Sequence, residues 1–175
     1  LLLITCFTLG KLLYLSVSQL PHLKMEIKIA EFQPEYREDF KNLNVEWLEK
    51  YFVVEEHDLE QLNNPEEIVE NGGHIYFANE DGVNLGTATL IKEGDTEFKL
   101  AKMAVTEAAK GKGIGNLLME HCISEAQKLG AKKIILLSNR SLTPAITLYK
   151  KYGFAEVPIS NNPYARGNIK MELVL

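Results

Sequence analysis

The sequence of 175 residues predicts a single domain of mixed α/β class. In segments such as 26–30, apolar residues stand at alternate positions, which is the period of a strand. Between Tyr36 and Tyr51 they recur at intervals of three and four, which is the period of an amphipathic helix. In the second half, strand, glycine-rich loop, helix, strand, helix and strand follow one another. This order favours a parallel strand pair joined by a right-handed crossover.

The composition is that of a globular protein, with 46% hydrophobic and 25% charged residues. The net charge of −5, without a basic stripe, argues against a nucleic-acid partner. Cys6 and Cys122 lie far apart, and neither they nor the histidines have metal-ligand spacing. We therefore expect reduced thiols, a cytoplasmic location and no metal site.

Residues 1–24 differ from the rest because they are rich in apolar residues, interrupted by Lys11 and a few polar residues. Met25 then opens the alternating segment MEIKIAEF. We expect residues 1–24 to lie outside the fold and residues 25–175 to form the domain. A membrane anchor is the alternative, since the apolar run approaches the roughly 20 residues that span a bilayer.

The first half predicts a strand at 26–30 and a helix from Tyr36 to Tyr51, followed by a shorter helix near 57–62. Pro65 begins a turn or a short helix. Strands at 74–79 and 86–92 form a hairpin, and a strand at 97–105 follows.

The second half predicts a helix that begins near Gly113 and ends before Gly130. Segment 131–138 contains a continuous apolar run, as expected of a strand covered on both faces. The next helix has Thr143 as its N-cap and Pro144 at its first position. Strict alternation over 169–175 predicts a closing strand.

The loop before the first of these helices is the strongest functional signal. It reads Lys-Gly-Lys-Gly-Ile-Gly over 110–115. A helix start offers unpaired N–H groups and the positive end of the helix dipole, and glycine lets an anion approach the backbone. The spacing fits neither the Walker loop nor the dinucleotide motif, so we expect a different pyrophosphate ligand.

Two motifs resemble those of the GNAT superfamily of acetyl-CoA-dependent N-acetyltransferases. Motif A, [Gln/Arg]-x-x-Gly-x-[Gly/Ala] after an apolar-x-Val strand end, resembles the stretch from Met103 to Gly115. Motif B resembles Asn139 and the following segment 145–154. Lys110 departs from the family pattern, and lysine lacks the planar fork of arginine. The resemblance covers 25–175 in element order and is specific over about 100–157.

The resemblance implies a mostly antiparallel sheet of about seven strands with about four helices. The sheet would be splayed between the strand ending at Val105 and that of 134–138, where acetyl-CoA would enter. The backbone of 103–105 would hold the pantetheine arm, the loop 110–115 the pyrophosphate, and Asn139 the pantetheine region. The implied cofactor-binding residues are Met103, Ala104, Val105, Lys110, Gly111, Lys112, Gly113, Ile114, Gly115 and Asn139.

For catalysis the resemblance implies direct attack of a primary amine on the thioester, without a covalent enzyme intermediate. Tyr149 would face the sulfur and protonate the leaving thiolate as general acid, although a helical tyrosine can also be a packing residue. The N–H of Val105 would stabilise the oxyanion. Glu97 is the first choice for a general base, ahead of three weaker candidates: Glu55, Glu56 and His74.

The residues that bind the acceptor amine have no general sequence motif in this family. Acidic residues at 46, 49, 55, 56 and 58 are able to attract a cationic amine, and Arg166 is a candidate for a carboxylate contact or a structural ion pair. Two other functions remain open, namely a CoA-binding sensor that has lost catalysis and a membrane-tethered interaction protein. We expect a monomer or a homodimer.

Overall fold

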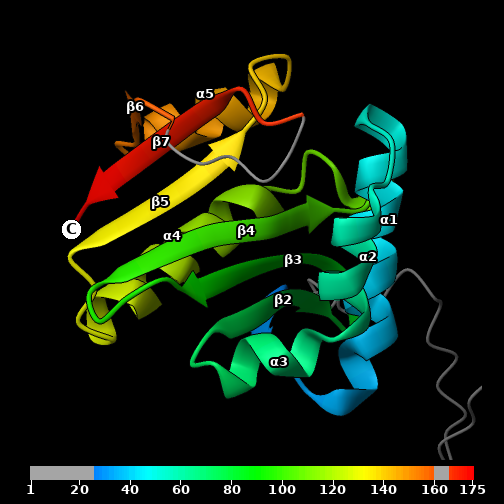
Figure 1. The fold of residues 1–175 in the computed structure, drawn as a ribbon. Coiled ribbons are helices and arrows are strands. Elements are labelled where there is room, and N and C mark those ends of the chain that lie inside the picture. Colours follow the sequence, from blue (N-terminus) through cyan, green and yellow to red (C-terminus); the bar gives the residue numbers. More distant parts are fainter. Residues whose placement is uncertain (1–25, 160–165) are drawn as a thin grey trace, which may run out of the picture.

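The computed structural model describes residues 26–159 and 166–175, so the expected leader, 1–24, lies outside the described residues. One sheet has the strand order β1-β2-β3-β4-β5-β7-β6 (Figure 1). Its strands are β1 (Lys28–Glu31), β2 (His74–Glu80), β3 (Val83–Lys92), β4 (Glu97–Val105), β5 (Lys133–Ser138), β6 (Ala155–Val157) and β7 (Ile169–Val174). Neighbouring strands are antiparallel except β4 and β5, which are parallel. The mixed α/β class and the mostly antiparallel sheet are confirmed.

Five α-helices accompany the sheet within the described residues. They are α1 (Arg37–Tyr51), α2 (Glu56–Asn63), α3 (Pro65–Glu70), α4 (Ile114–Lys128) and α5 (Thr143–Lys151). The segment after Pro65, which the sequence left as a turn or a short helix, is α3. Thr143 is the first residue of α5 and not its cap, because the N-cap position is taken by Leu142. The short strand β6 did not appear in the sequence pattern, and its three residues pair with β7.

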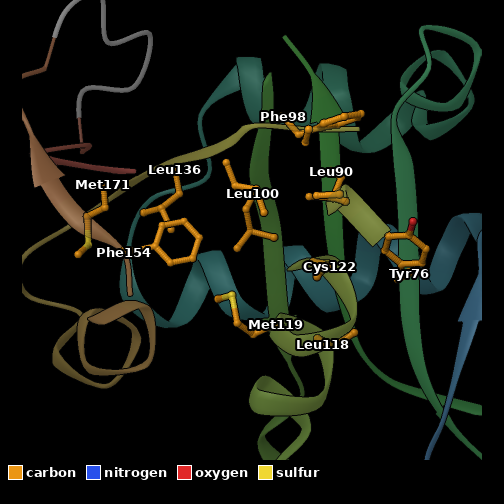
Figure 2. Packing of buried hydrophobic residues seen from close by; sticks show 14 of the residues in the cluster. Tyr76, Leu90, Phe98, Leu100, Leu118, Met119, Cys122, Leu136, Phe154 and Met171 are labelled. Carbon is orange, nitrogen blue, oxygen red and sulfur yellow. The ribbon is translucent and has the colours of Figure 1, made fainter. Parts of the chain in front are cut away.

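The helices cover both faces of the sheet and enclose two apolar clusters. On one face, the buried residues Leu118, Met119 and Cys122 of α4 meet Leu90 of β3 and Leu100 of β4 (Figure 2). The opposite face is covered by α1 to α3, whose side chains pack in a second cluster with residues of β2 and β4. The strand β4 therefore contributes to both clusters.

A bulge in β4 explains why Leu100 and Ala104, which stand four residues apart, pack in different clusters. Thr89 pairs with Ala101 and Thr87 with Ala104, so two residue steps on β3 face three on β4. Lys102, within this stretch, has a φ of 48°, in the left-handed region. Because side chains alternate between the faces of a strand, one extra residue reverses the alternation. Leu100 accordingly packs in the α4 cluster and Ala104 in the α1 cluster.

The strands β4 and β5 pair only at their beginnings. Their register runs from Glu97 opposite Lys133 to Lys99 opposite Ile135. Beyond this point β4 continues to Val105 and β5 to Ser138 without pairing each other, and the two arrowheads stand apart in Figure 1. The sheet is thus splayed where the sequence resemblance implied it.

Candidate functional site

A cavity of about 120 Å³ lies where β4 and β5 separate. Its walls come from α1, α2, β4, the end of β5, α5 and the segment before β7. Its lining includes Asn44, Trp47, Asp58, Lys102, Met103, Ser138, Asn139, Tyr149 and Arg166. Of the residues expected to bind the cofactor or to catalyse, Met103, Asn139 and Tyr149 therefore meet in one cleft.

The end of β4 offers backbone groups to this cleft. The N–H of Thr106 donates to the Leu85 carbonyl of β3 at 2.9 Å. Because backbone groups of successive strand residues point to opposite edges, those of Val105 and Met103 point away from β3, toward the edge that β5 has left. The backbone groups of Ala104 point toward β3 instead, and the residue is 2% exposed. The strand thus presents two of the three expected residues at its open edge.

The glycine-rich loop has the backbone conformation that an anion site requires. Gly111 and Gly113 have φ values of 82° and 80°, and a Cβ built at either position would meet no atom within 4 Å. Gly113 is the N-cap of α4, without a capping side chain. In the described part of the chain, the N–H groups of Gly111, Gly113, Ile114 and Gly115 have no recorded backbone acceptor. A diphosphate would find free donors and open space here.

The two lysines of the loop are exposed and engaged with neighbouring side chains. The Lys110 ammonium donates a hydrogen bond to the Tyr51 hydroxyl at 2.9 Å and forms an ion pair with Glu107. Lys112 pairs with Glu80 at 2.9 Å. The hydrogen bond with Glu107, followed by that with Tyr51, raises the pKa of Lys110, so its charge is retained at neutral pH. Both side chains carry positive charge beside the loop.

Tyr149 enters the cleft from α5. Its ring packs 6.0 Å from that of Phe154, centroid to centroid. Burial raises the pKa of the phenol, and a hydrogen bond with the Ser138 side chain acts in the opposite direction. The phenol is therefore protonated at neutral pH, as a proton donor must be.

Asn139 organises the turn after β5. Its amide nitrogen donates to the Arg166 carbonyl at 2.6 Å, and its amide oxygen accepts the N–H of Ser141 at 2.9 Å. One amide N–H and one lone pair remain for a ligand, because an asparagine amide has two of each. Asn139 thus holds the segment before β7 against the cleft.

Glu97 lies apart from this constellation. It begins β4 at the end where β4 and β5 are still paired, and its carboxylate forms an ion pair with Lys133 at 2.6 Å. It does not line the cavity. Among the weaker candidates, Glu55 pairs with Arg166 at 3.0 Å, and His74 stacks on Tyr76 on the far side of β3. The structure does not bring Glu97 together with Tyr149.

A buried cluster of charges forms one wall of the cleft. Asp58 of α2 is fully buried and accepts a hydrogen bond from Arg166 at 2.6 Å. The Lys102 ammonium lies 3.7 Å from the same carboxylate, and its side chain is 8% exposed. Burial would raise the pKa of Asp58, but the hydrogen bonds from Arg166 and the Glu55 N–H hold it below its usual value. Burial also lowers the pKa of Lys102 to about 8.

The sequence analysis gave Lys102 no role, although the apolar pattern of its strand indicates a bulge at this residue. Apolar residues of this strand stand at 98 and 100 and then at 103 and 105, so the alternation slips by one residue at Lys102. Such a slip is the sequence pattern of a bulge. The pairing of Arg166 with Asp58 confirms its expected alternative as a structural ion pair.

Among the described residues, no group of three or more His, Cys, Asp or Glu side chains is placed to hold a metal ion. None of the helices in the described ranges combines the length and the apolar character needed to cross a bilayer.

The fold and the cleft define an acyltransferase of the type in which a strand pair separates beside a glycine-rich helix start. The sequence profile of the acetyltransferase (GNAT) family matches residues 30–154, and the chain belongs to this family. This confirms the relationship that the two motifs indicated and, with it, the enzyme class of N-acetyltransferase.

Curated relatives carry the same activity in their names. An uncharacterized N-acetyltransferase of Schizosaccharomyces pombe is 27% identical over 140 residues, which are 74% of this chain and 83% of the yeast protein. An N-alpha-acetyltransferase of Sulfurisphaera tokodaii is 35% identical over 80 residues, 45% of this chain and 46% of the relative. The [ribosomal protein bS18]-alanine N-acetyltransferase of Escherichia coli is 37% identical over 68 residues, 39% of this chain and 46% of the relative. The last two alignments thus span less than half of each relative.

Solved structures share the fold. An acetyltransferase of the GNAT family from Staphylococcus aureus superposes with a TM-score of 0.76 at 22% identity, over 84% of this chain and 98% of that one. The PaiA N-acetyltransferase of Thermoplasma acidophilum, solved in complex with coenzyme A, gives a TM-score of 0.71 at 19% identity, over 86% and 100%. At these identities the likeness concerns the fold.

Proposed function

We propose that this protein transfers the acetyl group of acetyl-CoA to a primary amine by direct attack of the amine on the thioester. The observation that carries the proposal is the position of four unpaired N–H groups, at Gly111, Gly113, Ile114 and Gly115, at the start of α4 beside the open edge of β4. One ligand with a diphosphate and an extended amide-containing arm would use both features. Coenzyme A has these two parts, and the Thermoplasma relative was solved with it.

Each part of the ligand would have a partner in the chain. The loop 110–115 would bind the diphosphate through its N–H groups, with Lys110 and Lys112 adding positive charge. The backbone groups of Met103 and Val105 at the open edge would form hydrogen bonds with the amides of the arm. The arm would thus bind as an additional strand does at a sheet edge. Asn139 would use its remaining amide N–H for the same arm.

The catalytic proposal concerns charge at two atoms. The carbonyl oxygen becomes negative during attack, and the N–H of Val105, which points to the open edge, would stabilise it. The departing thiolate needs a proton, and Tyr149 would donate one from its phenol in the cleft. The hydroxyl of Ser138 would then donate a hydrogen bond to the phenolate. The phenolate would regain a proton from solvent, to which the attacking amine releases its own proton.

The relatives guide the choice of acceptor. One is named as an alanine N-acetyltransferase of ribosomal protein bS18 and another as an N-alpha-acetyltransferase. An acceptor panel for this protein therefore contains peptides with free α-amines beside lysine side chains and small amines.

Two measurements test the proposal. Calorimetry with acetyl-CoA measures binding, and release of free thiol over the acceptor panel measures transfer. Absence of any heat of binding would refute the proposal as a whole. Binding without transfer to any amine of the panel would contradict the enzyme and leave the CoA-binding sensor as the function.

The role of Tyr149 is tested by Tyr149→Phe, with Tyr152→Phe as the matched control. Tyr152 lies on the same side of the domain, but its hydroxyl donates to Glu120 at 2.6 Å, away from the cavity lining. Loss of a general acid costs about 10²–10⁴-fold in rate. We expect turnover to fall by at least about a hundredfold in Tyr149→Phe, with acetyl-CoA affinity within about threefold of wild type. Equal turnover of the two variants would remove Tyr149 from the mechanism.

A further inference from the structure

The side chain of Lys102 lies inside the cleft that the proposed function assigns to the thioester. The bulge directs Lys102 to the face covered by α1 and α2, where it lines the cavity with Asp58 and Arg166. The next residue along β4 is Met103, whose backbone groups point to the open edge. A primary amine of the protein is thus held one residue from the backbone that would hold the acyl arm.

The surroundings of Lys102 increase the fraction of its amine that is neutral. The Asp58 carboxylate, which faces it from α2, favours the charged form, but this carboxylate is shared with Arg166 from the segment before β7. Glu55, the N-cap residue of α2, pairs with Arg166, and Lys99 of β4 adds a further positive charge. Desolvation is the largest influence and lowers the pKa of Lys102 to about 8. At pH 7.5 roughly a quarter of such a group is neutral, compared with about one in a thousand for an ordinary lysine.

We propose that Lys102 is a self-acetylation site, at which the protein transfers one acetyl group from acetyl-CoA to its own cleft. This inference rests on the proposed function, because it needs acetyl-CoA in the same cleft. The Lys102 nitrogen attacks the thioester carbonyl carbon, a C–N bond forms and the C–S bond breaks. The nitrogen loses one proton, the sulfur gains one, and the products are N-acetyl-lysine and the free thiol of CoA.

The modification would change the acceptor side of the cleft. Acetylation removes the positive charge of Lys102, so the Asp58 carboxylate would retain only the Arg166 guanidinium as a cationic partner in the described wall. The wall would also gain an apolar acetyl group inside a cavity of about 120 Å³. We therefore expect the modified protein to accept a narrower set of amines than the unmodified one.

The test follows acetylation of the wild-type protein by peptide mass spectrometry after incubation with acetyl-CoA and no other amine. We expect Lys102 to be acetylated at least about ten times faster than Lys128, a surface lysine whose side chain is 67% exposed. The rate is expected to rise more than about tenfold between pH 6 and pH 8, following the neutral fraction. Lys102→Arg, which keeps the charge, removes the modified peptide and shows how much acceptor turnover depends on this lysine.

A variant that binds the cosubstrate more weakly distinguishes catalysed from spontaneous acetylation. Gly113→Ala places a methyl group in the anion loop, whereas Gly130→Ala places one at the other end of α4. At an acetyl-CoA concentration below the wild-type Kd, we expect Lys102 acetylation to slow by about tenfold or more in the first and to stay within about twofold of wild type in the second. Equal acetylation in both, or an unmodified Lys102 in protein that still binds acetyl-CoA and acetylates other amines, would overturn the inference and leave the proposed function standing. Lack of acetyl-CoA binding by wild-type protein would instead refute both.

Discussion

The glycine-rich loop gives the sharpest prediction, through two alanine substitutions on the same helix. Gly113 precedes α4 and Gly130 follows it, with φ values of 80° and 79°, and a Cβ at either position would meet no atom within 4 Å. Alanine in the left-handed conformation costs about 1–2 kcal/mol at each site. For a domain of this size we expect both variants to lower the melting temperature by a similar amount, roughly 2–8 °C.

The two variants differ in their expected effect on ligand binding. The space beside Gly113 is where a diphosphate would approach the N–H groups of the first turn of α4, and a methyl group there would displace it. Loss of one or two hydrogen bonds to a charged group costs about 1.5–3 kcal/mol each. We expect the Kd for CoA to rise about tenfold or more in Gly113→Ala and to stay within about twofold of wild type in Gly130→Ala.

Calorimetric titration with CoA at one pH and salt concentration measures both affinities, and thermal unfolding of the same samples checks the matched cost in stability. Wild-type affinity in Gly113→Ala would refute the assignment of the loop as the diphosphate site. A comparable loss in Gly130→Ala would show that the affinity follows stability and not the geometry of the loop.

Two further predictions concern buried titratable groups. The pKa of Lys102 is about 8 in the folded protein and about 10.4 in the unfolded chain, so the unfolded state binds more protons between these values and stability rises with pH. From pH 7 to pH 10, the free energy of unfolding of wild type should therefore gain roughly 2.5 kcal/mol relative to Lys102→Met in denaturant titrations, and a constant difference would contradict the lowered pKa. Cys122 is fully buried and burial raises the pKa of its thiol, so it should react with a thiol reagent at least about a hundredfold slower in native than in denatured protein. Cys122→Ala supplies the background rate, and fast native labelling that this variant abolishes would show that the core around α4 opens.

Local signals in the sequence predict most of the fold. Alternating and helical periods place nearly all the elements, and glycines mark both ends of α4, because these features depend on neighbouring residues. The strand β6 escapes such reasoning, since its three residues are ordered mainly by pairing with β7. The position of Thr143 differs by one residue from the prediction, within the usual uncertainty of helix ends.

The candidate site divides in the same way. The glycine-rich loop and Tyr149 follow from motifs of consecutive residues, and both lie near the point where β4 and β5 separate. Glu97 is on the expected strand. The register between two parallel strands cannot be predicted from the sequence of either strand alone. This register puts Glu97 at the paired end of β4, beside Lys133. The contact between Asp58 and Arg166 joins residues 108 positions apart, which no local pattern can predict.

The bulge of β4 also affects which changes in length this protein can tolerate. Removing one residue between Leu100 and Met103 would abolish the bulge and restore regular alternation, so Leu100 would stay on the face of α4 and Ala104 on the face of α1. The strand would lose its left-handed residue but keep its contacts with both apolar clusters. During divergence of this sequence, a one-residue deletion at the bulge is thus compatible with the core, and loss of Lys102 itself would change only the charges of the cleft.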